Sequence, residues 1–235
     1  LVWLGAEGQA MLASSGVCGV TPATSYWSED NGRIWLAQNT PAPVLGSVDI
    51  TGKSAATVVG ATQDCSAAQS YSTTSSVQDW AAGTPVSATW YVLPTSPGQI
   101  GGTTGQAPSP CERTIALAPA SAGEAAVLCS TGAVLNTTNG GATWRSKGAL
   151  LEARAMAALT ESALVALQTR SDCSGTGISI STNGGATWGP GACLEGFDAS
   201  GPVGLDTQAN RVLAVAANGR SFLSEDAGTT FTPLS

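Results

Sequence analysis

Apolar residues occur along the chain in short runs that are separated by turns rich in Gly, Ser, Asn and Thr. Short apolar runs bounded by turn residues predict β-strands, and β-branched residues within them favour the same structure. The stretch from Leu150 to Leu167 is long enough to suggest a helix, but its position relative to an internal repeat favours two strands. The pattern therefore predicts an all-β fold.

Four segments share one consensus, S/T-x-D/N-x-G-x-T-W/F, and a fifth, degenerate copy is expected to start at Ser72. The main positions of the four clear copies are Ser28, Asp30, Gly32, Trp35; Thr137, Asn139, Gly141, Trp144; Ser181, Asn183, Gly185, Trp188; and Ser224, Asp226, Gly228, Phe231. We expect the hydroxyl and the Asp or Asn side chain to cap their own turn. The Gly is expected to adopt a backbone angle that other residues resist, and the aromatic side chain to pack inward.

The five copies begin at residues 28, 72, 137, 181 and 224, so the intervals are 44, 65, 44 and 43 residues. A period of about 43 residues is typical of a four-stranded propeller blade. We therefore expect residues 1–235 to form a single β-propeller domain of five four-stranded blades. The innermost strands are expected at Val2–Ala6, Val48–Gly52, Thr114–Ala118, Ala155–Leu159 and Val203–Asp206.

The long interval contains a stretch rich in Pro, Gly, Ser and Thr, residues 94–111. This composition predicts a loop inserted between the second and third blades. The alternative is a six-bladed propeller, in which residues 86–111 form a reduced blade.

Charged residues make up 11% of the chain and hydrophobic residues 43%, so uncharged polar residues must cover much of the surface. The net charge is −7, and the nine Lys and Arg residues are scattered. Nucleic acid and anionic membranes are bound by clustered basic residues, so we expect neither as a partner. Every apolar run falls well short of the ~20 residues that span a bilayer, so we expect no membrane insertion of this segment.

Six cysteines without any histidine predict three disulfides rather than a zinc site. Their positions in the repeat favour the pairs Cys18–Cys65, Cys111–Cys129 and Cys173–Cys193. Disulfides indicate an extracytoplasmic protein, secreted or in the cell envelope. Because Leu1 lies inside an expected strand, we also expect a leader or anchor upstream of this segment. The abundance of Ala, Gly and Thr favours a bacterial source.

The repeated S/T-x-D/N-x-G-x-T-W motif resembles the Asp-box, or BNR repeat, of bacterial sialidases, sortilin-type receptors, some xyloglucan hydrolases and photosystem assembly factors. The resemblance recurs four times, covers nearly the whole chain and implies a β-propeller. In these families the motif lies on the outer edge of the blade, away from the central pocket. The resemblance thus implies a structural role for Asp30, Asn139, Asn183 and Asp226, and it does not define an activity.

A sialidase-like hydrolase would need an arginine cluster for the substrate carboxylate and a Tyr–Glu nucleophile pair. Arg113 and Arg154 precede inner strands at similar positions and could both face a central channel, but no third arginine joins them. A pair of catalytic carboxylates could come from Asp49, Glu112, Glu152, Asp198 and Asp206, but we favour solvated rim or turn positions for these residues, because acidic residues at strand ends are mostly solvated. Without histidine, a Ser or Cys triad is disfavoured. The turn Asp30–Gly32 lacks the spaced carboxylates of a calcium loop, so we expect no metal and no cofactor.

Trp90 and Tyr91, next to the inserted stretch, are not explained by the repeat. They either pack the insertion onto the propeller or stack against a partner. The leading interpretation is a monomeric, non-catalytic scaffold that binds a protein or carbohydrate partner through Trp90, Tyr91, Arg113, Arg154 and the inserted loop. The alternative is a sialidase-like glycoside hydrolase or a carbohydrate-binding protein.

Overall fold

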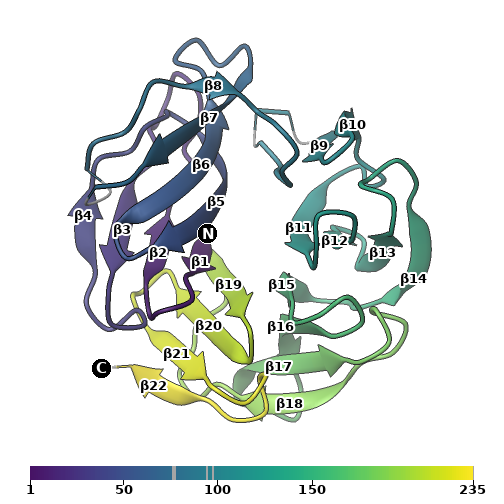
Figure 1. Cartoon of the computed structure of the whole chain (residues 1–235). Coiled ribbons are helices and arrows are strands. Elements are labelled where there is room, and N and C mark those ends of the chain that lie inside the picture. Colours follow the sequence, from purple (N-terminus) through teal and green to yellow (C-terminus); the bar gives the residue numbers. More distant parts are fainter. Residues whose placement is uncertain (76–77, 94, 97, 235) are drawn as a thin grey trace.

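The computed structural model describes residues 1–75, 78–93, 95–96 and 98–234. These residues form β-strands and turns, and no helix among them could cross a membrane. Five sheets of four antiparallel strands are arranged in a ring (Figure 1). The predicted all-β propeller with five four-stranded blades is confirmed.

Each blade consists of four strands that follow one another in the sequence, with the first strand innermost. Blade 1 contains β1 (Val2–Leu4), β2 (Ala10–Ala13), β3 (Ser25–Ser28) and β4 (Leu36–Gln38), and blade 2 contains β5 (Leu45–Gly52), β6 (Ala55–Ala61), β7 (Ala68–Thr73) and β8 (Thr84–Pro85). Blade 3 contains β11 (Thr114–Pro119), β12 (Ala125–Cys129), β13 (Ala133–Thr137) and β14 (Arg145–Ala149). Blade 4 contains β15 (Ala153–Ala158), β16 (Leu164–Arg170), β17 (Gly175–Ser181) and β18 (Gly189–Cys193), and blade 5 contains β19 (Val203–Gln208), β20 (Arg211–Ala216), β21 (Ser221–Ser224) and β22 (Thr232–Leu234).

Burial changes from the second strand of a blade to the outermost one. All residues of β12 are buried, as are those of β20 after Arg211, whereas β14 and β22 are mostly exposed. Both faces of a second strand pack against neighbouring blades, which explains the continuous apolar runs in the sequence. The core is therefore a series of apolar clusters between adjacent blades.

The repeated motif forms the turn between the third and fourth strands. In blade 1, the Ser28 hydroxyl donates to Asp30 Oδ1 (2.7 Å) and accepts the N–H of Gly32 (2.9 Å). Asp30 Oδ1 also accepts the N–H of Ile34 (2.9 Å). The turns at Thr137, Ser181 and Ser224 repeat this arrangement. The hydroxyl, carboxylate and amide groups of the motif are thus engaged in capping their own turns.

In the last turn, the hydrogen bonds from Thr230 and Ser224 lower the pKa of Asp226 to about 2. The carboxylate is therefore ionised at any physiological pH, as a turn acceptor should be.

The degenerate copy of the motif begins at Thr73, one residue later than the sequence suggested. Thr73 is buried, lies opposite Ala56 as Ser28 lies opposite Ala10, and accepts the N–H of Ser75 (3.3 Å). Trp80 then takes the aromatic position. Because this copy has lost both the Asp and the Gly of the motif, its sequence does not distinguish Ser72 from Thr73 as the first position. The strand pairing identifies Thr73. Ser76 and Val77 of this copy lie outside the described residues.

Four of the five motif aromatics pack on the blade that precedes their own. Trp35 joins the cluster between blades 5 and 1, Trp80 that between 1 and 2, Trp188 that between 3 and 4, and Phe231 that between 4 and 5. Trp144 of blade 3 packs instead on residues that precede blade 3 in the sequence, among them Trp90 and Ile100.

The alternating strand directions give the ring two different faces. We call the face with the motif turns the turn face, and the opposite face, where the inner strands begin, the disulfide face. All three predicted disulfides are present, and they lie on the disulfide face. Cys18–Cys65 joins blades 1 and 2, Cys111–Cys129 lies at the start of blade 3, and Cys173–Cys193 ties two loops of blade 4.

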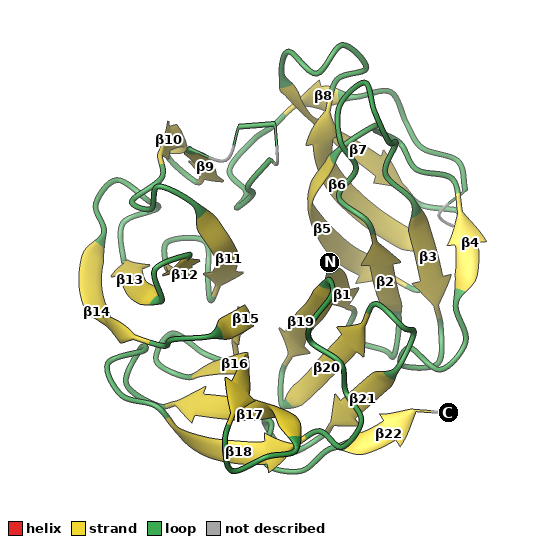
Figure 2. Cartoon of the chain, turned by 180° about the vertical axis from the view of Figure 1, so that it is seen from behind, coloured by secondary structure: helices red, strands yellow, loops and turns green. Residues whose placement is uncertain are grey.

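The described residues of the stretch 86–111, which we call the insert, lie in the ring between blades 2 and 3 (Figure 2). Where the sequence suggested a loop, the insert contains the two-stranded sheet β9 (Gln99–Gly102) and β10 (Gly105–Pro108). Gly101 makes this sheet compatible with its surroundings, since a Cβ there would lie 1.9 Å from the Tyr91 ring. Pro94 and Pro97 lie outside the described residues.

Candidate functional site

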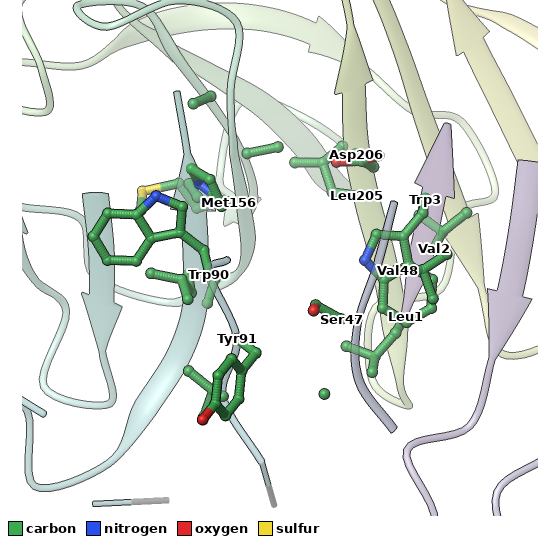
Figure 3. Close-up of a pocket in the computed structure, with 18 of the residues that line it drawn as sticks. Leu1, Val2, Trp3, Ser47, Val48, Trp90, Tyr91, Met156, Leu205 and Asp206 are labelled. Atoms are coloured by element: carbon green, nitrogen blue, oxygen red, sulfur yellow. The ribbon is translucent and has the colours of Figure 1, made fainter. Parts of the chain in front are cut away.

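The inner strands of the five blades and residues 87–92 of the insert enclose a central cavity of about 1500 Å³. Figure 3 shows its lining, with Trp90, Tyr91 and Met156 opposite Ser47, Val48, Leu1 and Trp3. Apolar and hydroxyl side chains thus both line its wall. Typical small-molecule pockets measure about 300–1,000 Å³, so this cavity is large enough for a more extended ligand.

Arg113 and Arg154 both line the cavity, near its opening on the disulfide face, and both are exposed. Their positions are similar rather than equivalent. The inner strands β11 and β15 both contain a bulge, which follows Thr114 in β11 and Ala153 in β15. Thr114 is therefore equivalent to Ala153, and Arg113 is equivalent to Glu152 rather than to Arg154. Within the described part of the chain, neither guanidinium forms an ion pair. The cavity mouth thus presents two arginines without a carboxylate partner.

Trp90 and Tyr91 are both 7% exposed and serve chiefly as packing residues. The Trp90 indole lies edge-on to Trp144, with ring centroids 6.2 Å apart, and its Nε1 donates to the Ser121 carbonyl (2.9 Å). Tyr91 packs against Val59 of blade 2, and burial raises the pKa of its hydroxyl. Their remaining exposed surface faces the cavity.

The five carboxylates considered as catalytic candidates are dispersed. Glu152 and Asp198 do not line the cavity, and Asp198 accepts the N–H of Ser200 (2.8 Å). Asp49 and Glu112 line it and are exposed. Glu112 lies at the disulfide face, whereas Asp206 comes near the other end of its inner strand. The structure therefore does not bring these carboxylates together as one set.

Asp206 is the most perturbed carboxyl group of the cavity. Burial raises its pKa to about 7, against the opposing effect of hydrogen bonds from the backbone N–H groups of Leu4 and Thr207. The bond from Leu4 N to Asp206 Oδ2 is 2.7 Å long and links blade 5 to blade 1. The sequence pointed to Asp206 only as one acid among five. Its signal is a single acidic residue directly after the apolar run from Val203 to Leu205.

Together, the five sheets and the central cavity define a β-propeller. No protein-family model matches the chain, and no curated protein matches it either. Solved structures do resemble it. The structure described as YCF48 bound to D1 peptide shares 16% identity, with a TM-score of 0.52, over 99% of this chain and 79% of that one.

A functionally unknown protein from Desulfotomaculum acetoxidans DSM 771 shares 9% identity, with a TM-score of 0.52, over 97% of this chain and 82% of that one. YCF48 from Cyanidioschyzon merolae shares 12% identity, with a TM-score of 0.49, over 94% and 83% of the two chains. At these identities the similarity establishes the fold alone.

Proposed function

We propose that this chain is a non-catalytic, extracytoplasmic Asp-box propeller that binds a protein partner at the disulfide-face mouth of its central cavity. The observation that carries the proposal is the pair of exposed arginines, Arg113 and Arg154, on the wall of a cavity of about 1500 Å³. Guanidinium groups without a carboxylate partner favour an acidic group on a ligand.

Two further observations support this proposal. The Cys111–Cys129 disulfide adjoins the cavity-lining residues Arg113 and Ser130, so it restrains this part of the mouth before a ligand binds. The similar structure of YCF48 was obtained with a bound D1 peptide, which supports a protein rather than a small molecule as the partner class. Disulfides also support an oxidising compartment.

Selection from a random dodecapeptide library displayed on phage would test the proposal. Selected peptides should bind the protein, and the double substitution Arg113→Glu/Arg154→Glu should lower their affinity by about tenfold or more, equivalent to ~1.4 kcal/mol. The matched control is Arg145→Glu/Lys147→Glu, which makes the same change of charge on the exposed outer strand β14. Equal loss of affinity in both variants, or no selectable peptide, contradicts the proposal.

A carbohydrate ligand or a glycosidase activity is the second candidate, and Asp206 favours it. A carboxyl group with a pKa of about 7 can donate a proton near neutral pH, as the general acid of a glycosidase does. A glycan array and a panel of chromogenic glycosides separate the two candidates. Turnover by the parent protein that disappears in Asp206→Asn would favour the hydrolase. No turnover by the parent protein would favour the scaffold.

A further inference from the structure

The insert occupies the place of a blade, but it lacks an innermost strand. In blades 1 and 5, the motif glycine approaches the second strand of the preceding blade: Gly32 lies next to Leu213 of β20, and Gly228 next to Val165 of β16. In blade 4, Gly185 instead approaches Val134 of the third strand β13. Gly141 of blade 3 lies next to Trp90, as Gly32 lies next to Leu213. Trp90 therefore stands where a second strand would stand.

The neighbours of residues 90–93 confirm this position. Tyr91 and Leu93 form a cluster with Val59 of β6, the second strand of blade 2. Trp90 clusters with Ala125 and Val127 of β12, the second strand of blade 3. Residues 90–93 thus lie beside second strands on both sides, and Val92 and Leu93 also approach Gly46 at the start of the inner strand β5.

The chain direction of this segment also matches a second strand. Trp90 Nε1 donates to Ser121, in the turn between β11 and β12 on the turn face. The carbonyl of Val92 lies near Gly46, at the start of β5 on the disulfide face. Residues 90–92 therefore run from the turn face to the disulfide face, as β6 and β12 do and opposite to every inner strand.

Within the described residues, no strand therefore pairs with residues 90–92 on the side opposite β9. Elsewhere in the ring, β11 packs against β15, β15 against β19, β19 against β1 and β1 against β5. Within the described chain, β5 and β11 do not adjoin, and residues 87–89 reach the cavity without joining a sheet. The central cavity extends into this gap, as the open space between Tyr91 and Ser47 in Figure 3 shows.

The segment 90–92 offers this gap an unpaired strand edge. Tyr91 exchanges both backbone hydrogen bonds with Gly101 (3.1 and 2.9 Å), so its N–H and C=O point toward β9. In an antiparallel pair, the backbone groups of the adjacent residues point the opposite way. The N–H groups of Trp90 and Val92 therefore point toward the cavity, and among the described residues they have no acceptor.

We propose that an extended segment of the partner protein enters the cavity at the disulfide face and completes the insert as its missing innermost strand. The segment would run antiparallel to residues 90–92, with its carboxyl end toward the turn face, and would accept hydrogen bonds from Trp90 and Val92. Strand addition of this kind draws affinity from the main chain and specificity from alternate side chains. The inference rests on the proposed function and specifies how the partner is held.

Amide hydrogen exchange, followed by NMR with the dodecapeptides selected above, tests this geometry. Peptide binding should slow exchange at Trp90 and Val92 by about tenfold or more, because both N–H groups gain an acceptor. Exchange at Tyr91 should not change, because its N–H is already bonded. Peptides that bind without slowing Trp90 and Val92 overturn the strand addition, whereas the proposed function survives if Arg113→Glu/Arg154→Glu still weakens them.

A pair of proline substitutions gives an independent measurement. Val92→Pro removes a cavity-facing N–H, and the extended residue before it tolerates proline. Gln106→Pro is the matched control. Gln106 lies opposite Gly101, and the backbone groups of Gly101 bond to Tyr91 rather than to Gln106. The Gln106 N–H therefore points outward from the same two-stranded sheet. Val92→Pro should lower peptide affinity by about tenfold and Gln106→Pro should not. Equal affinities in both variants overturn the inference.

Discussion

The contacts between neighbouring blades, which we call seams, differ between two places in the ring. Between blades 5 and 1, ordinary blade packing is reinforced by polar contacts: Asp206 accepts the Leu4 N–H, and the Arg211 guanidinium donates to the Gly5 carbonyl (3.1 Å) and to Asn31. Between blades 2 and 3, the insert substitutes for a blade and depends on two aromatic side chains, Trp90 and Tyr91. The first seam spreads its stability over many contacts, and the second concentrates it in a few.

Truncation of Trp90 should therefore have the largest effect on stability. Trp90→Ala removes a buried indole and its bond to Ser121, and we expect a loss of about 3–5 kcal/mol in the free energy of unfolding, measured with urea. Trp80→Ala is the control, because Trp80 is a partly buried motif aromatic whose indole bonds to Asn39. A loss at Trp80 as large as that at Trp90 would show that the insert is no more vulnerable than the other seams.

The closing seam should respond to pH through Asp206. Its pKa is raised from 3.8 to about 7 in the folded protein, so the unfolded chain ionises it at lower pH. Protonated Asp206 stabilises the folded protein, and this contribution to the free energy of unfolding is fully present below pH 4. It is lost as the pH rises through about 7, a change of up to about 4 kcal/mol.

Asp206→Asn should abolish this part of the pH dependence and raise the melting temperature at pH 8 relative to the parent protein. Asp49→Asn, which changes an exposed carboxylate of the same cavity, is the matched control. Melting curves from pH 4 to pH 8 that remain parallel for the parent and Asp206→Asn would refute a role for this proton in closing the ring.

The disulfides permit a finer comparison of the insert with an ordinary blade. Cys111–Cys129 and Cys173–Cys193 span 18 and 20 residues, so loop entropy alone predicts a similar stabilisation of about 3 kcal/mol each. Cys111 and Cys129 are buried in the cluster of Trp90, whereas Cys193 is exposed. Replacement of the first pair by alanine should therefore cost more stability in urea than replacement of the second pair, and equal costs would indicate loop entropy alone.

The sequence predicted the parts of the fold that repeat. Motif spacing predicted the five blades, and the positions of the cysteines in the repeat predicted all three disulfides. Both signals are local, because a capped turn needs only eight consecutive residues. The start of the degenerate copy was misplaced by one residue because Thr73 and Ser72 are both hydroxyl residues, and only the pairing with Ala56 distinguishes them.

The site was less predictable because it depends on contacts between distant segments. Trp90 and Tyr91 stood out in the sequence, but their packing against blades 3 and 2 depends on the glycines of β9 and on clusters from two other blades. The raised pKa of Asp206 arises from burial, and the N–H group that bonds to its carboxylate belongs to Leu4, at the other end of the chain. No pattern within a blade contains either relationship.

The hydrogen bond from Leu4 to Asp206 also bears on synthesis. The two residues are 202 positions apart, so blade 1 emerges from the ribosome long before the blade that covers it. Until then, Val2, Leu4 and Ala10 expose the apolar face that Leu213 and Val215 finally cover. Contacts between residues so far apart in the sequence form late in folding, and the intermediates that precede them are prone to aggregation. We therefore expect the chain to expose this apolar face until blade 5 has been synthesised, and removal of blade 5 should produce aggregates rather than a smaller folded protein.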